Sequence, residues 1–106
     1  MLSIPEATSR AGFWLGLSKL EADIPRVVAE AVRLAEVPSP TGSEERRAAL
    51  VRELMADSLE FANIDEAGNV LACVKGASGR DGTVILAPLD SWYGTEMHPL
   101  VDVRTD

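Results

Sequence analysis

The residue with the clearest potential for chemistry is Asp90, which follows the apolar run Thr83-Val84-Ile85-Leu86-Ala87-Pro88-Leu89. Such a run predicts a buried strand, and a carboxylate directly after it lies at the carboxyl edge of a sheet. In open α/β folds, ligands and metals bind at this edge. Asp90 is therefore the first candidate for a catalytic or ligand-binding residue.

Other metal-binding and nucleophilic residues near Asp90 are few. The chain has a single histidine, His98, whereas a hydrolytic zinc site needs about three protein ligands and an open position for water. We interpret His98 as an exposed loop residue rather than a displaced ligand. A triad of Ser91, His98 and Asp102 would rest on composition alone, because no glycine pattern of a nucleophile elbow surrounds the serine.

Two helices are predicted before these residues. An apolar stripe predicts a helix from Asp23 to about Val37, with Asp23 as N-cap, and Pro38 disfavours helical geometry at the residue before it. Residues 1–22 form an amino-terminal helical extension whose aromatic face covers the domain or docks onto a partner. The residues of that face stand at helical spacing: Phe13, Trp14, Leu17 and Leu20.

A third helix follows the rigid turn at residues 38–42. Thr41 and Glu44 have the spacing of a capping box, with Ser43 as the competing N-cap. One face of the helix is apolar and consists of Ala48, Val51, Leu54, Met55 and Leu59. The charged residues expected to face water are Glu45, Arg46, Arg47, Arg52, Glu53 and Asp57.

Strands are predicted after residue 60. Residues 61–64 and 70–75 form a hairpin around the turn 65–69, with Cys73 as a buried thiol. Residues 76–82 are a plain connection, since they lack a phosphate-binding signature. Residues 83–89 form a central strand covered on both faces, and Val101 and Val103 indicate a short final strand. The predicted fold class is α/β, with two or three helices packed on a small mixed sheet over residues 23–106.

Composition narrows the classes of partner. The chain has 106 residues, a formal net charge of −7 and a hydrophobic content of 46%, which is typical of one globular domain. The acidic balance argues against nucleic acid and against a membrane surface as partners. No apolar run reaches the roughly 18 residues of a membrane span, and the start of the chain lacks a signal peptide. We therefore expect a cytoplasmic protein.

Three segments resemble motifs of the zinc aminoacylase and carboxypeptidase family, which includes acetylornithine deacetylase. Residues 34–45 are similar to its first-helix exit, Ile-Pro-Ser-x-Ser-Gly-x-Glu, and residues 64–70 to its Asp-x-x-Gly-Asn-Val hairpin. The version Asp-Glu-Ala-Gly-Asn resembles hydrolases that release lysine or ornithine from an amino-group carrier protein. Residues 85–90 stand where the family has its His-x-Asp strand.

The resemblance implies a role for two residues. Asp90 matches the aspartate that orients the metal-binding histidine through a hydrogen bond. Pro88 stands at that histidine position, and proline has no side-chain donor for zinc. The resemblance therefore implies no metal ligand in this chain, and zinc only where a longer protein supplies the remaining ligands: an aspartate in Gly-Arg-Gly-x-x-Asp, a Glu-Glu pair and a distant histidine.

Two functions follow as expectations. The first is the amino-terminal part of a metal-dependent amide or peptide deacylase that is not catalytically self-sufficient and continues past Asp106. The second is a free-standing, non-catalytic binding or assembly module derived from the same fold. In both, the rest of the catalytic domain, a protein partner or a second copy covers the exposed sheet edge.

Overall fold

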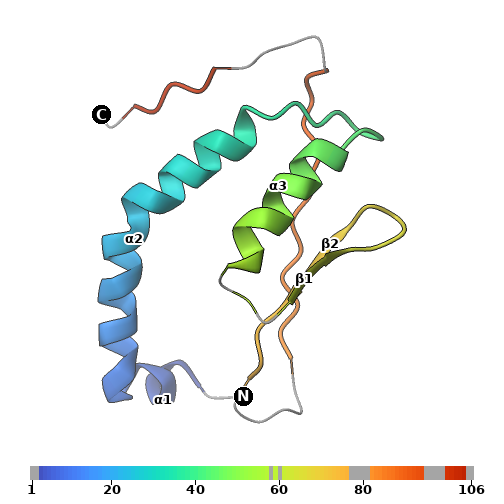
Figure 1. Cartoon of the computed structure of the whole chain (residues 1–106). Coiled ribbons are helices and arrows are strands. Elements are labelled where there is room, and N and C mark those ends of the chain that lie inside the picture. The colour runs from blue at the N-terminus through green and yellow to red at the C-terminus, as the bar shows by residue number, and fades with distance from the viewer. Residues whose placement is uncertain (1–2, 58, 60, 77–81, 95–99, 105–106) are drawn as a thin grey trace. The chain divides into compact units, whose positions relative to one another are not determined.

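The computed structural model describes residues 3–57, 59, 61–76, 82–94 and 100–104. Its elements are α1 (Ile4–Thr8), α2 (Ala11–Ala35), α3 (Glu45–Ala56), β1 (Phe61–Ile64) and β2 (Val70–Cys73) (Figure 1). Three helices and a small two-stranded antiparallel sheet confirm the predicted α/β class. The chain divides into two compact units, Met1–Val32 and Arg33–Asp106.

Helix α1 begins with a capping box that the sequence analysis did not identify. The Glu6 backbone N–H donates to Ser3 Oγ at 3.4 Å, and the Ser3 backbone N–H donates to Glu6 Oε2 at 2.8 Å. These two bonds satisfy donors that the helix itself leaves unpaired. The Ser3 side chain also lowers the pKa of Glu6, because its hydroxyl stabilises the charged carboxylate.

Helix α2 is continuous where the sequence predicted a break before Asp23. Pro25 lies inside the helix, and Asp23 pairs with Arg26 at 3.2 Å instead of capping a new helix. Arg26 also pairs with Glu30 at 3.1 Å. These pairs support a helix across the proline, which costs one backbone hydrogen bond. Figure 1 shows α2 bending near its middle, as expected where a proline removes a donor.

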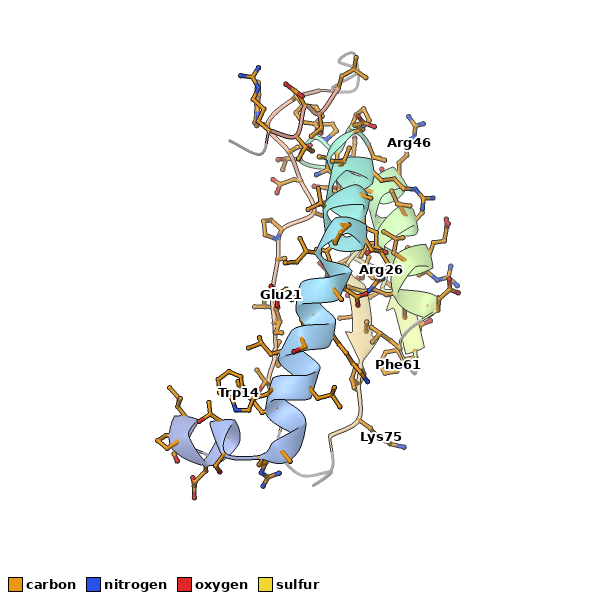
Figure 2. The ribbon with its side chains drawn as sticks, turned by 90° about the vertical axis from the view of Figure 1, so that its left-hand side faces the viewer. Trp14, Glu21, Arg26, Arg46, Phe61 and Lys75 are labelled. Atoms are coloured by element: carbon orange, nitrogen blue, oxygen red, sulfur yellow. The ribbon has the colours of Figure 1, made fainter. Side chains whose placement is uncertain are left out.

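The aromatic face of α2 is exposed. Phe13 and Trp14 make an edge-to-face contact with ring centroids 5.2 Å apart, and Figure 2 shows the Trp14 side chain projecting away from the helix. No described residue of α2 is buried. That this face covers the domain or docks onto a partner stays a prediction.

Helix α3 packs on the hairpin and presents the predicted apolar face to it. Ala48 is 1% exposed and is the only buried apolar residue among those described, while Val51 and Leu54 are half-buried. The predicted capping box is wrong. Glu44 is the N-cap without a capping side-chain bond, because its Oε1 accepts from the Gly42 N–H at 2.7 Å.

The hairpin confirms the predicted turn. Strands β1 and β2 pair in the register Phe61↔Cys73 and Ile64↔Val70. Asp65 Oδ1 accepts from the backbone N–H of Asn69 at 2.8 Å, and Gly68 adopts the positive φ of 87° that the turn requires. The Asn69 side chain, donating to the carboxylate, is the main cause that lowers the pKa of Asp65.

Strand β2 differs from the prediction in two respects. It ends at Cys73 rather than near Lys75. The thiol of Cys73 is exposed rather than buried, because the described residues place no layer of structure over it. A two-stranded sheet without such a layer leaves the side chains on one face in solvent.

The predicted central strand at residues 83–89 is also wrong in its pairing. These residues are extended but join no ladder, and Ile85 and Leu86 are 88% and 89% exposed. The parallel part of the expected mixed sheet reduces to one bridge, Pro40↔Ser91. A strand forms only when it pairs with the backbone of a neighbour. Among the described residues, strand β2 pairs with β1 alone, and a groove that both line separates β2 from residues 83–89. Residues 100–104 form no strand either.

Candidate functional site

Asp90 lies where the extended segment meets the loop before α3. The Thr41 hydroxyl donates to Asp90 Oδ2 at 2.8 Å. The loop turns at Gly42, whose φ of 86° lies in the region that favours glycine, and the Ser43 N–H donates to the Pro40 carbonyl at 2.9 Å. The turn brings Thr41 to the carboxylate from 49 residues away in sequence.

Ser91 fastens the same segment to the loop through its backbone. Its N–H donates to the Ser39 carbonyl at 2.6 Å, and its hydroxyl donates to the same oxygen at 3.3 Å. Ser39 is fully buried. This bridge fixes the residue directly after Asp90, so Ser91 has a structural role at this site.

Arg47 is the centre of this junction. It reaches from the first turns of α3 and donates through Nη1 to the Leu89 carbonyl at 3.0 Å. Through Nη2 it donates to the Val37 carbonyl at 2.5 Å and to Ser91 Oγ at 3.1 Å. The side chain is half-buried, and one guanidinium therefore joins three segments of the chain.

Tyr93 completes the junction. Its hydroxyl accepts from Arg47 Nη2 at 3.0 Å and donates to the Ala35 carbonyl in the last turn of α2. That carbonyl is one of those that a helix leaves unpaired at its carboxyl end. Trp92, edge-to-face with Tyr93 at 5.9 Å between centroids, is 90% exposed. Tyr93 thus fastens the segment, and Trp92 stands at its surface.

The sequence analysis was wrong about Arg47, which it placed toward water. A positional signal could have identified it, since Arg47 stands four residues before Val51 and seven before Leu54. This spacing places the arginine within the apolar face of α3. Arg46, one position earlier, does face solvent, and Figure 2 shows it pointing away from the helix.

The described residues do not fit a zinc site. Pro88 is exposed and has no donor atom, and no three described His, Cys, Asp or Glu residues stand close enough to hold a metal. His98 lies outside the described residues, as do residues 77–81 of the connection. Asp102 pairs with Arg104 at 3.0 Å, and the described structure does not bring it to Ser91.

An apolar groove of about 1110 Å³ lies beside the junction. It is lined by β2, by the extended segment and by residues of the apolar face of α3. Glu44, Arg47 and Asp90 are the charged residues of its lining. The apolar lining includes Val51, Met55, Leu59, Val70, Leu71, Val74, Ile85, Leu86 and Leu89. The arrangement can hold extended polypeptide or another apolar chain beside a carboxylate.

Comparison with protein-family models, with curated proteins and with solved structures found no match. Among the helices of the described residues, none combines the length and the apolar character that crossing a membrane requires.

Proposed function

We propose that this chain forms the amino-terminal part of a metal-dependent hydrolase-like protein of the amide or peptide deacylase type. The observation that carries the proposal is the 2.8 Å contact between Thr41 and Asp90. Each residue belongs to a segment that resembles a motif of the same family, and the two segments are far apart in sequence. Their meeting supports the interpretation that both motifs serve one site.

The shortage of buried apolar surface supports the need for further polypeptide. Ala48 is the only buried apolar residue among those described, whereas Val84, Ile85 and Leu86 are at least 80% exposed. Covering apolar surface stabilises a protein by about 25 cal/mol per Å². Polypeptide that lies in the groove between β2 and residues 83–90 would gain this free energy.

The chain's own part in the proposed activity is limited to position. Asp90 is the candidate to orient a group supplied by further polypeptide, and Pro88 supplies no ligand. A lysine or ornithine substrate is part of this proposal through the resemblance of the hairpin turn, residues 65–69, to the amino-group-carrier hydrolases.

Sequencing the native transcript across the codon for Asp106 tests the proposal directly. We expect an open reading frame that continues into a Gly-Arg-Gly-x-x-Asp segment and a later Glu-Glu pair. A stop codon at that position would contradict the proposal.

Pro88→His in that longer polypeptide tests the ligand position. We expect histidine at residue 88 to raise zinc affinity, measured by calorimetry, because it adds a nitrogen donor two residues before Asp90. Ala87→His is the matched control, since successive side chains of an extended segment point to opposite faces. Equal zinc affinity in both variants would show that the segment lacks the geometry of the site.

A second candidate function is a free-standing, non-catalytic binding or assembly module. The exposed apolar residues of α2 favour it, since Trp14 and Leu20 are 59% and 67% exposed. Light scattering and zinc analysis of the purified 106-residue chain test it. A stable oligomer without zinc would support the module, and a monomeric, partly unfolded chain would contradict it.

A further inference from the structure

We propose that Arg47 is a positioning residue for Asp90. Its guanidinium binds the residues on both sides of Asp90, the backbone of Leu89 and the side chain of Ser91, and so sets where the carboxylate stands. The inference rests on the proposed function only for what Asp90 does; the positioning itself concerns contacts within this chain.

The contacts of Arg47 bracket Asp90. Nη1 donates to the carbonyl of the preceding residue, Leu89, at 3.0 Å, and Nη2 donates to the hydroxyl of the following residue, Ser91, at 3.1 Å. The Asp90 carboxylate itself accepts from Thr41. Arg47 therefore acts on Asp90 through the two neighbouring residues of the chain and not as its ion-pair partner.

The acceptors around Arg47 are all neutral: the carbonyls of Leu89 and Val37 and the hydroxyls of Ser91 and Tyr93. In addition, Arg47 Nε is buried and has no hydrogen-bond partner among the described residues. An unpaired buried donor costs free energy, and an apolar side chain at this position of α3 would avoid that cost. The hydrogen bonds that its two terminal nitrogens donate therefore explain why an arginine stands at this position.

The shape of the guanidinium suits this role. Its two terminal NH₂ groups diverge in one plane and donate in several fixed directions, whereas a lysine ammonium is a compact charge on a flexible stem. The segment joins no strand ladder in the described structure, and one parallel bridge at Ser91 accompanies the guanidinium. The hydrogen bonds of Arg47 thus hold this segment in place, as ladder bonds from neighbouring strands would hold it in a larger sheet.

Amide exchange and ¹³C NMR of the 106-residue chain test the proposal with Arg47→Gln. We expect the Ser91 amide to exchange at least about tenfold faster, because charge-assisted hydrogen bonds that hold the segment are lost. The Asp90 ¹³Cγ resonance should move toward its position in a denatured chain. The amides of β1 and β2 should be unchanged, which a general loss of stability would not allow.

Arg46→Gln is the matched control, since Arg46 faces solvent on the same turn of α3, and we expect it to change neither signal. Arg47→Lys keeps the charge and should not restore the Asp90 resonance. Wild-type Ser91 exchange and an unmoved Asp90 resonance in folded Arg47→Gln would overturn the proposal.

A measurement on the unmodified protein covers the case in which Arg47→Gln does not fold. Four acceptors surround the two NH₂ groups, three of them around the two hydrogens of Nη2. Because these bonds hold the guanidinium, we expect separate NMR signals for its two NH₂ groups at low temperature. A single averaged signal would overturn the proposal. None of these readouts needs hydrolase activity, so a stop codon after Asp106 would end the hydrolase proposal and leave this one standing.

Discussion

At the scale of single residues, hydrogen bonds from a side chain to the backbone decide the local structure. Asp65 accepts from the N–H groups of Ala67 and Asn69 at 3.0 and 2.8 Å and so organises the hairpin turn. Arg47 does the same for the segment around Asp90. In both cases one side chain bonds several backbone groups at once.

Acid should open the hairpin turn through Asp65. Its pKa is lowered in the folded chain, chiefly by the Asn69 side chain, so the stabilising effect is present above the ordinary value of about 4. The effect is lost as pH falls through the lowered pKa. Asp65→Ala should weaken the turn at pH 7 and remove this pH dependence.

NMR of the Gly68 and Asn69 amides between pH 7 and pH 2 measures the effect. Glu66→Ala is the control, because Glu66 is an exposed residue of the same turn. The same acid transition in Asp65→Ala as in the wild type would contradict this prediction.

Gly68→Ala should destabilise the protein by about 1–2 kcal/mol. The φ of Gly68 is 87°, and the left-handed region costs an ordinary residue about this much. Gly76→Ala is the matched control, since a Cβ there meets no atom within 4 Å and its φ is not in that region. Urea unfolding compares the two, and equal midpoints would show that the turn relaxes without cost.

At the scale of elements, success of sequence-based prediction depended on whether the signal was local. The hairpin turn was predictable because Asp65, Gly68 and Asn69 act within five residues of one another. The structure of the segment before Asp90 was not predictable, since the pairing of a strand depends on backbone neighbours that lie elsewhere in the sequence. Arg47 lay between these cases: its place on the apolar face of α3 was readable, but the carbonyls that it reaches were not.

Pro25→Ala should increase the stability of α2. Proline inside a helix costs about 3 kcal/mol relative to alanine, and Pro25 stands in the middle of a 25-residue helix. We expect a larger helical signal in circular dichroism and a higher thermal midpoint. Pro5→Ala, in the first turn of α1 where proline is tolerated, should change little. An unchanged signal in Pro25→Ala would indicate that the two halves of α2 are already independent.

At the scale of the whole molecule, only Ser39 and Ala48 are buried among the residues that the structure describes. Ala48→Asp should destabilise the protein by more than about 2 kcal/mol, because it buries an unpaired charge between α3 and the hairpin. Ile85→Asp should change stability by less than about 0.5 kcal/mol, because Ile85 is 88% exposed. Urea unfolding of the two variants checks the contrast. A large loss in Ile85→Asp would mean that polypeptide already covers this segment in solution.

The extended segment before Asp90 has one more consequence, which concerns proteases. A protease binds its substrate as an extended chain, and Val84–Leu86 already has that form, with side chains at least 80% exposed. Cleavage after Leu86 therefore needs no prior unfolding, whereas cleavage after Leu54 needs α3 to open first. A chymotrypsin-like enzyme should cut this chain between the hairpin and the residues held by Arg47. Polypeptide lying in the groove would protect the bond.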